Sequence, residues 1–538
     1  MLFDYVIVGA GSAGSALAAR LSANGRFTVA LIEAGPSDRR FWIQTPIGYA
    51  KTFNDASVNW MFTSEPVPGL GGRVLPVPRG KVLGGSSSIN ALVYIRGQAA
   101  DYDDWREMGN TGWGWQDVLP YFRRLEDYPN GDPALHGKGG PVGITDPSRQ
   151  AHRTTKAYYD GAIELGIPYN PDFNGATQEG VGPYHLTVRG GLRSSAARAY
   201  LWPSMSRKNL FVETEALVTR IVFEGRRAVG IDVRKNGETL FLRAQREVIL
   251  SSGAIGSPQL LQVSGVGPSA LLKEHGIPIV HVNESVGQNL QEHAAYDHYY
   301  RAKVRTMNAT LYPWWGQAFW GAMYLAFRRG PLSLSINQGG GFVRSSPDRA
   351  RPNMQLYFCP MSFQKAPAGS SAFIVPDKQS GFSLTVSPCR PHSRGWVKIK
   401  SADPSVAPMI QPNLLADHRD VAEMLEGARL LRQLRSTEAL SAIIDHETMP
   451  GAEVQDDAAL IEDIRAKTNS IYHPSCSCRM GTDPMSSVVD PKLKVHGVSG
   501  LRIIDASVFP TVTSGNLNGP SLMVGEKGAD LVVADTRG

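Results

Sequence analysis

A histidine followed by two cysteines is the group in this chain whose residue types and spacing best suit chemistry. Residues 471–481 read IYHPSCSCRMG, so Cys476 and Cys478 stand at i+3 and i+5 from His473. These residue types bind zinc, whereas a histidine alone can transfer a proton because its pKa lies near neutral pH. A zinc site needs three or four ligands, and no second ligand cluster accompanies this motif in the sequence. The sequence therefore predicts no metal site, and it leaves His473 as a proton-transfer residue or a structural histidine.

A glycine-rich stretch near the N-terminus can bind a phosphate group. VGAGSAG places Gly9, Gly11 and Gly14 in GxGxxG spacing, between a short strand pattern and a helical pattern. This spacing brings the backbone at a helix N-terminus close to a pyrophosphate. Glu33 ends the next strand pattern, in LIEAG, where its carboxylate can accept hydrogen bonds from the ribose hydroxyls of an adenosine. The segment predicts a βαβ unit that binds NAD or FAD, and glycines that only permit a tight turn are the alternative.

Strand, helix and loop patterns along the rest of the chain indicate more than one core. From about residue 209, several runs rich in Val, Ile, Thr and Phe predict a β meander that ends in a buried strand, EVILSSGA. Residues 300–455 are richer in tryptophan, proline and long loops, and they predict a second domain. The C-terminal stretch, from LRIID to DLVV, returns to strand, loop and helix. A chain of 538 residues with 42% apolar side chains can bury two cores.

Charge and cysteine content exclude several classes of protein. The 55 basic and 49 acidic residues give a net charge of +6, but no run of five lysines or arginines occurs, so no nucleic-acid partner is expected. Four cysteines are too few for a disulfide framework at this length, and the N-terminus lacks the pattern of a secretory signal. A cytoplasmic location is therefore expected.

One apolar stretch, from Leu311 to Phe327, has two interpretations. LYPWWGQAFWGAMYLAF spans 17 residues and contains a proline and two glycines, which makes it short for crossing a bilayer. It is either a helix that covers the core or the active site, or an interfacial helix that contacts the inner membrane peripherally, with Arg328 and Arg329 at its edge.

Five longer motifs resemble the signatures of the glucose-methanol-choline (GMC) flavoprotein oxidoreductases. In chain order they are PRGKVLGGSSSINALVYIRG, GAIGSPQLLQVSGVGP, VGQNLQEH, IYHPSCSCRMG and SGNLNGPSLMVGEKGADL. Together with the GxGxxG unit they run from residue 4 to residue 531, so the resemblance covers nearly the whole chain. Within the family, the chain looks closest to bacterial alcohol, sorbose and choline dehydrogenases.

The resemblance implies an α/β fold, in which a Rossmann-like FAD-binding domain is interleaved with an α+β substrate domain built on an antiparallel sheet. The FAD-binding domain is expected to be discontinuous and to comprise residues 1–155, 196–300 and 462–538. Residues 156–195 and 301–461 are expected to form the substrate-binding domain.

The resemblance also implies which residues hold the cofactor, FAD. The adenosine and diphosphate are expected on the βαβ unit and a nearby strand, at Gly9, Gly11, Ser12, Ala13, Gly14, Glu33, Ala34 and Val218. The flavin and its chain are expected against the GGSSSINALV loop and the C-terminal segments, at Gly84, Gly85, Asn90, Ala91, Leu92, Val93, Asp505, Ala506, Gly519 and Pro520. Relatives with covalent flavin carry a histidine where this chain has Ile89, so non-covalent FAD is expected.

The family has a catalytic histidine in its counterpart of IYHPSCSCRMG, and the resemblance extends that role to His473. Loss of hydride from a carbinol carbon needs a base for the hydroxyl proton, which an imidazole can be. The second family residue is His or Asn before the final helix, and NGPS places Asn518 there, where its amide can donate to the substrate oxygen. A structural histidine and a helix-capping asparagine are the alternatives. Cys476 and Cys478 are then expected to be small buried residues.

The sequence therefore predicts FAD-dependent oxidation of a primary alcohol to an aldehyde, with oxygen, a quinone or a dye as the electron acceptor. The alternatives are a hydroxynitrile lyase, which binds FAD in this fold without redox use, and a choline dehydrogenase. Choline-oxidising relatives carry a glutamate where this chain has Gln338, and an amide offsets the desolvation of a trimethylammonium group less well. A small neutral alcohol is expected as substrate, unless Gln338 only hydrogen-bonds a loop or the motif match is one residue out.

Overall fold

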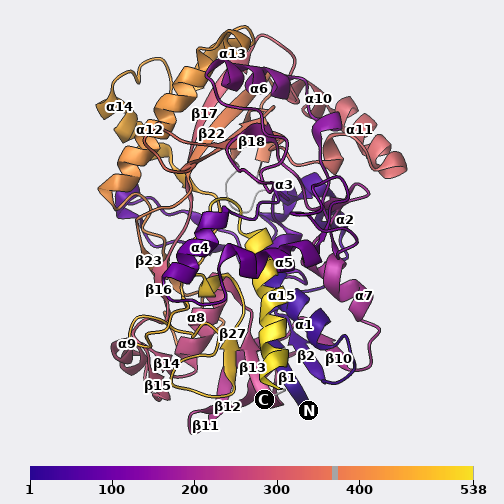
Figure 1. Ribbon diagram of the computed structural model, residues 1–538, viewed down its shortest axis with the longest axis vertical. Coiled ribbons are helices and arrows are strands. Elements are labelled where there is room, and N and C mark those ends of the chain that lie inside the picture. The colour runs from indigo at the N-terminus through magenta and orange to yellow at the C-terminus, as the bar shows by residue number, and fades with distance from the viewer. Residues whose placement is uncertain (366–373, 537–538) are drawn as a thin grey trace.

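A computed structural model describes residues 1–365 and 374–536 of the chain (Figure 1). Two large sheets lie toward opposite ends of the long axis, one near the two termini and one at the far end (Figure 1). The first sheet takes strands from both ends of the chain and from its middle, so the chain passes between the two regions more than once. The expected α/β fold, with an antiparallel sheet in the second region, is confirmed.

The sheet near the termini is mainly parallel and contains the expected βαβ unit. β1 (Leu2–Val8) pairs in parallel with β2 (Val29–Ile32) on one side and with β13 (Glu238–Leu250) on the other. Its other strands are β10 (Leu210–Glu213) and β27 (Leu501–Ile503), both parallel, and the antiparallel β12 (Arg227–Lys235) and β11 (Leu217–Glu224). The parallel core buries both faces, which explains its unbroken apolar runs.

Two helices from opposite ends of the chain lie side by side against this sheet (Figure 1). They are α1 (Ser12–Leu21) and α15 (Asn518–Asp535). Glycine permits their close approach, since a Cβ added at Gly525 would lie 2.6 Å from the backbone oxygen of Ala13. The N-terminal end of each helix therefore lies at the edge of the sheet where β1 ends.

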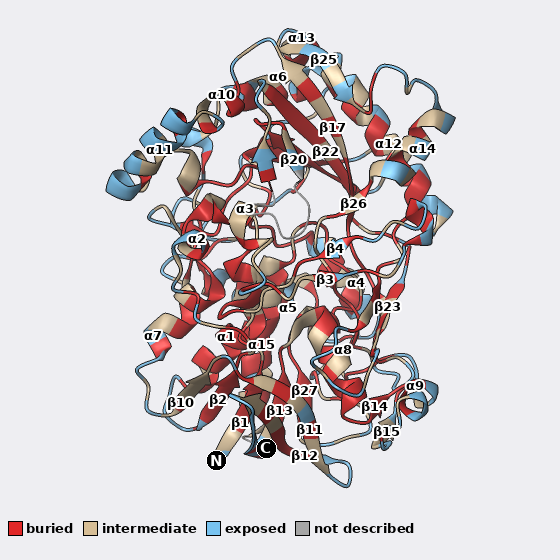
Figure 2. Cartoon of the chain, turned by 180° about the vertical axis from the view of Figure 1, so that it is seen from behind, coloured by how far each residue is buried: buried red, intermediate tan, exposed pale blue. Residues whose placement is uncertain are grey.

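The sheet at the far end is antiparallel. Its strand order is β25 (Ile444–Met449), β17 (Ala294–Ala302), β22 (Gly381–Pro388), β19 (Met354–Cys359), β18 (Gly339–Val343) and β7 (Gly180–Pro183). α12 (His418–Arg435) packs on one face of this sheet. Tyr357 in β19, and Ser383 and Thr385 in β22, line a cavity. Both sheets are largely buried (Figure 2). The expected domain boundary at residue 300 falls inside β17, a strand of this second sheet.

One apolar helix projects from the side of the molecule beside the second sheet. α11 (Trp314–Phe327) buries only Gly316 and Tyr324 along its 14 residues, and its outer turns are exposed (Figure 2). One interpretation of the sequence was a helix that covers the core or the active site. The structure shows that α11 does not bury its apolar face against the core. In the part of the chain that the structure describes, we find no helix with the length and apolar character needed to cross a membrane.

Candidate cofactor and catalytic site

Two adjoining cavities meet at the N-terminal ends of α1 and α15. The first has a volume of about 200 Å³ and the second about 260 Å³. Both are lined by Ser12, Arg79, Ser86, Pro474, Ala506 and Ser521. At their junction, Ser12 Oγ donates a hydrogen bond to Asn518 Oδ1 at 2.8 Å, so the first residues of the two helices touch. The positive ends of two helix dipoles favour an anionic group at this position.

The glycine turn between β1 and α1 shapes the first cavity. A Cβ added at Gly14 would lie 2.0 Å from the Gly9 carbonyl oxygen, so the turn requires glycine there. Gly11 lines the cavity, and a Cβ at this residue would meet no protein atom nearer than 3.9 Å. The fold thus leaves open space beside the backbone at the start of a helix, which fits the pyrophosphate of a dinucleotide.

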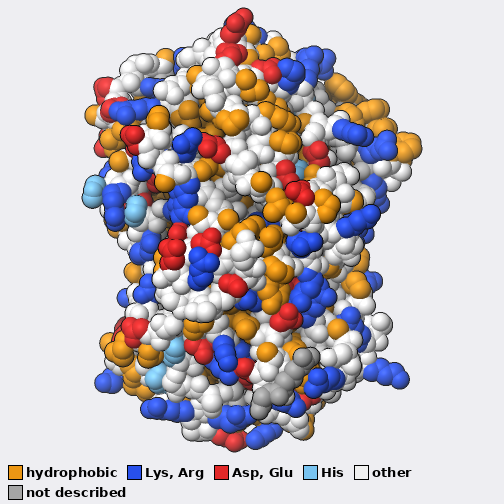
Figure 3. Space-filling model, in the orientation of Figure 1, with side chains coloured by type: hydrophobic (Ala, Val, Ile, Leu, Met, Phe, Trp, Pro, Cys, Tyr) orange, Lys and Arg blue, Asp and Glu red, His pale blue; other side chains and the backbone are white. Residues whose placement is uncertain are grey.

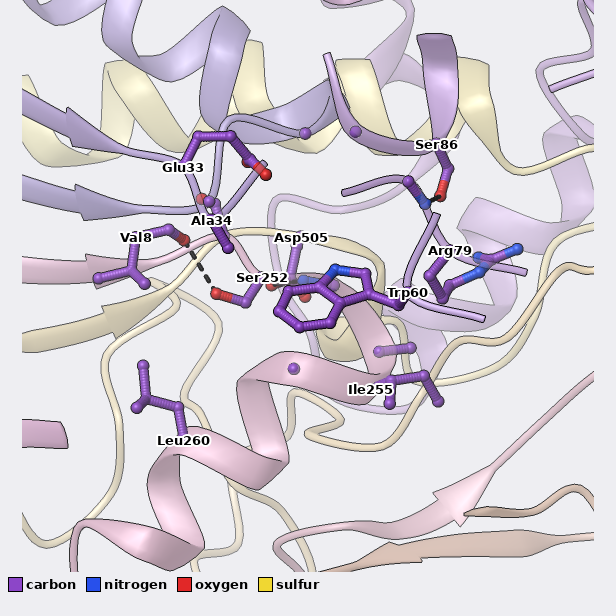
Figure 4. Close-up of a pocket in the computed structure, with 18 of the residues that line it drawn as sticks. Val8, Glu33, Ala34, Trp60, Arg79, Ser86, Ser252, Ile255, Leu260 and Asp505 are labelled. Carbon is purple, nitrogen blue, oxygen red and sulfur yellow. Dashed lines mark hydrogen bonds between the residues drawn. The ribbon is translucent and has the colours of Figure 1, made fainter. Parts of the chain in front are cut away.

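Glu33 lies at the end of β2 and lines the same cavity (Figure 4). Its carboxylate accepts hydrogen bonds from the backbone N–H groups of Ala10 and Gly35, both at 2.9 Å. Burial raises the pKa of Glu33 to about 7, while these backbone hydrogen bonds oppose the rise. Because each carboxylate oxygen has a second lone pair, Glu33 can still accept hydrogen bonds from the ribose hydroxyls, the role that the sequence predicted.

The other expected cofactor residues divide between the two cavities. The first is lined by Gly9, Gly11, Ser12, Ala13, Glu33, Ala34, Gly85, Val218, Asp505 and Ala506, and the second by Ser12, Asn90, Ala91, Leu92, Val93 and Ala506. Gly14, Gly84, Gly519 and Pro520 are not among the residues that line either cavity. Trp60 and Arg79 line the first cavity without having been expected there (Figure 4). Arg79 stands within the PRGKVLGG motif, whereas Trp60 has no signal in the sequence.

His473 lies in the second cavity, where hydrogen bonds hold its side chain and its backbone. Its Nε2 is 3.1 Å from Asn516 Nδ2, and its Nδ1 is 3.0 Å from His293 Nδ1. Its backbone N–H donates to Glu292 Oε1 at 2.5 Å. Burial is the main cause that holds the pKa of His473 well below its usual value, and His293 and Arg79 add to the effect. The imidazole is therefore neutral at pH 7 and able to accept a proton.

The backbone on both sides of His473 adopts an uncommon conformation. Tyr472 and Cys476 have left-handed φ angles of 70° and 71°, which cost non-glycine residues about 1–3 kcal/mol and are enriched at functional sites. Cys476 and Cys478 are buried, as expected, and both are free cysteines. Among residues 1–365 and 374–536, no group of three or more His, Cys, Asp or Glu side chains is arranged to hold a metal ion.

Asn516 is the asparagine that contacts His473, whereas the sequence indicated Asn518 as the donor to the substrate oxygen. Asn518 Oδ1 accepts from Ser12, whereas Asn516, two residues earlier, places its Nδ2 beside the imidazole. Asn516 Oδ1 accepts from Gln355 Nε2 at 3.1 Å, which fixes the orientation of the amide. Both asparagines line the second cavity. The GNLNG motif contains both, and only their positions relative to the start of α15 distinguish them.

Gln338, the expected substrate residue, is buried and is not among the residues that line the second cavity. Its Oε1 accepts from the backbone N–H of His152 at 2.6 Å, and its Nε2 lies 3.2 Å from Met307 Sδ. Its neighbours Ile336 and Asn337 line the cavity instead. The structure thus matches the alternative that Gln338 hydrogen-bonds a neighbouring segment.

Comparison with known protein families finds the same class of protein over most of the chain. Two models described as GMC oxidoreductase match it, an N-terminal one over residues 3–295 and a C-terminal one over residues 391–525. An oxygen-dependent choline dehydrogenase of Photobacterium profundum is 40% identical, over 99% of this chain and 93% of the relative. An alcohol dehydrogenase [acceptor] of Pseudomonas putida is 41% identical, over 99% and 96%.

Solved structures of similar shape span the whole chain. A pyridoxine 4-oxidase from Mesorbium loti aligns with a TM-score of 0.89 at 30% identity, covering 99% of each chain. An FAD-dependent oxidoreductase from Chaetomium thermophilum aligns with a TM-score of 0.90 at 27% identity, covering 99% of this chain and all of the other.

Proposed function

Because this chain belongs to the GMC oxidoreductase family, we propose that it oxidises a small neutral primary alcohol to the aldehyde, with His473 as the proton acceptor. Membership of the family makes it an FAD-dependent oxidoreductase that acts on CH–OH donors. The position of His473 is the observation that carries the proposal. Its neutral, half-buried imidazole lines a cavity that adjoins the one with space for the diphosphate of FAD.

Two residues of the second cavity, His473 and Asn516, have separate roles in the proposed reaction. Bound FAD supplies the acceptor for the hydride from the carbinol carbon. His473 Nε2 accepts the hydroxyl proton, which keeps positive charge from building up on that carbon. We assign the role of hydrogen-bond donor to the substrate oxygen to Asn516 in place of Asn518, since Asn516 lies beside His473 and lines the same cavity, where its amide can donate to that oxygen. That hydrogen bond strengthens as the oxygen gains negative charge.

The substrate preference depends on what lines the second cavity. Apolar and aromatic side chains dominate one part of it, including Tyr49, Phe53, Ile336, Phe363 and Ile374. One carboxylate, Asp297, also lines it and accepts a hydrogen bond from Thr385 Oγ1 at 2.6 Å. Gln338 no longer supports the preference for a neutral substrate, because it is not part of the cavity lining. The apolar lining supports that preference in its place.

We expect an uncharged primary alcohol to be a better substrate than choline, by at least about tenfold in kcat/KM, because a permanent cation is costly to desolvate. A panel of alcohols of similar size, assayed with oxygen and separately with a quinone or dye, measures both this preference and the electron acceptor. A higher kcat/KM for choline would refute the neutral substrate and favour a choline dehydrogenase.

We further infer that FAD is held without a covalent bond. Ile89 is buried and lines the second cavity, and its side chain has no atom that could bond to the flavin. Denaturing the holoenzyme is expected to release all of its flavin into the supernatant, which visible absorbance measures. Flavin that remained with the precipitated polypeptide would contradict this inference.

Exposure of α11 supports a peripheral contact with the cytoplasmic side of the inner membrane. Trp314 is 80% exposed, and Trp315 and Phe319 are more than half exposed. Figure 3 shows hydrophobic side chains gathered at the side of the molecule where α11 projects, with basic side chains nearby. No charged residue occurs in residues 306–327, and Arg328 and Arg329 follow directly. Tryptophan rings and flanking arginines suit the boundary of an anionic bilayer, and a helix of about 21 Å is too short to span one.

Replacing Trp314, Trp315 and Phe319 together with serine is expected to reduce binding to phosphatidylglycerol-containing vesicles at least tenfold, since each lost side chain removes about 1.5–3 kcal/mol of apolar transfer energy. Co-sedimentation with vesicles measures the change, and the control is Met485→Ser, at a residue that is 82% exposed elsewhere on the surface. Equal binding by the triple variant would contradict the membrane contact. A wild-type dimer that the triple variant dissociates would instead assign this surface to a second copy of the chain.

A further inference from the structure

His293 belongs to a chain of hydrogen bonds that ends at the proposed base. His293 Nε2 lies 2.8 Å from the carbonyl oxygen of Cys389, and His293 Nδ1 lies 3.0 Å from His473 Nδ1. The two imidazole rings are nearly perpendicular, at 89°. His473 Nε2 then faces Asn516 Nδ2. His293 is 1% exposed and is not among the residues that line the cavities, so it can act only through His473.

The chemistry of the partners fixes the direction of each hydrogen bond. A carbonyl oxygen can only accept, so His293 Nε2 carries a hydrogen. Burial lowers the pKa of His293 to about 4, which leaves the ring neutral and its Nδ1 without a hydrogen. His293 Nδ1 must therefore accept the hydrogen bond, and His473 Nδ1 must donate it.

The other end of the chain gives the same assignment independently. Gln355 Nε2 donates to Asn516 Oδ1, so the amide nitrogen of Asn516 faces His473. An amide nitrogen donates and does not accept, and His473 Nε2 must therefore present its lone pair. In the opposite tautomer, two ring lone pairs would face each other at one end of His473, and two N–H groups at the other end.

We propose that His293 is a positioning residue that holds His473 in the tautomer with hydrogen on Nδ1, so that Nε2 carries the lone pair that takes the substrate proton. The inference rests on the proposed function, because it assigns the reacting nitrogen of the proposed base. The protonated form uses the same contact, since Nδ1 still donates to His293 after Nε2 has gained the proton. His293 thus holds the imidazole ring of His473 in one orientation throughout the reaction, and it transfers no proton itself.

Replacing His293 in the holoenzyme tests this directly. His293→Leu removes the acceptor, and we expect anaerobic flavin reduction by alcohol to slow at least about tenfold, with FAD content and KM little changed, because the wrong tautomer of a catalytic histidine is inactive. His293→Gln can still accept from His473 and donate to Cys389, so it is expected to recover most of the rate. His298→Leu is the matched control: His298 is also fully buried, but it is not among the residues that line either cavity.

A spectroscopic measurement separates this inference from the proposed function. The ¹⁵N shifts of labelled histidine are expected to report hydrogen on Nδ1 of His473 alone in the wild type. In His293→Leu they are expected to report a mixture of the two tautomers, because only Asn516 then favours hydrogen on Nδ1. Hydrogen on Nε2 in the wild type, or flavin reduction by His293→Leu at the rate of the His298→Leu control, would overturn the role of His293 alone. Failure of every alcohol to reduce the wild-type flavin would refute the proposed function, while the ¹⁵N shifts would still test the tautomer.

Discussion

Replacing His473 with alanine is expected to lower the rate of flavin reduction by at least about a hundredfold, or about 2.7 kcal/mol in activation free energy, while FAD stays bound. The expectation follows from the position of the imidazole, which lines the second cavity and is held neutral by burial. Without it, the second cavity lacks the imidazole that takes the hydroxyl proton as hydride leaves. Anaerobic mixing of the variant with alcohol, followed by flavin absorbance, measures the loss.

Near-normal turnover in a holo-variant would refute the role of His473. The variant must first be shown to retain its FAD, since a lost cofactor would also abolish activity.

The pH dependence of the wild type offers a second check on the role of His473. Because the pKa of His473 is lowered, its neutral form persists through neutral pH, and wild-type kcat/KM should fall only as the solution becomes acidic. A loss of activity on the alkaline side instead would contradict the assignment.

The second large effect is expected for Asn516→Ala, which should slow flavin reduction by about a hundredfold, the usual consequence of removing one donor to a developing oxyanion. The rate should fall more than substrate binding weakens, because the hydrogen bond strengthens as the substrate oxygen gains charge. Stopped-flow reduction at several alcohol concentrations separates the limiting rate from the apparent dissociation constant.

Asn518→Ala is the matched comparison for this prediction. Asn518 Oδ1 accepts from Ser12 at the junction of the two helices, so its loss should weaken FAD retention more than it slows hydride transfer. If Asn518→Ala gave the larger loss of rate, the position indicated by the sequence would be correct and the reassignment to Asn516 wrong. A pure rise in KM for Asn516→Ala would also count against its role.

The parts of the molecule that the sequence predicted well are those with local causes. The GxGxxG turn and Glu33 depend on a strand, a tight turn and a helix that are adjacent in sequence, so their spacing carries the geometry. Gly14 illustrates this, because the turn itself excludes a side chain there. The two-sheet α/β fold followed from the strand and helix patterns together with the family motifs.

The parts that the sequence did not predict depend on long-range packing. His293 stands in the quoted VGQNLQEH motif, but only folding brings it to His473, 180 residues later. The choice between Asn516 and Asn518 depends on where α15 begins, and helix ends are uncertain by one or two residues in any sequence pattern. Gln338 was misjudged for a related reason, since a loop residue next to the cavity lining need not point into it.

Anaerobic addition of a primary alcohol to the holoenzyme is the most direct test of the central claim, that the chain oxidises alcohols through its FAD. We predict that an uncharged primary alcohol bleaches the absorbance of the oxidised flavin in the wild type, and that His473→Ala slows this bleaching by at least about a hundredfold. A flavin that stayed oxidised with every alcohol, in an enzyme that cleaved α-hydroxynitriles, would contradict the claim and identify a lyase.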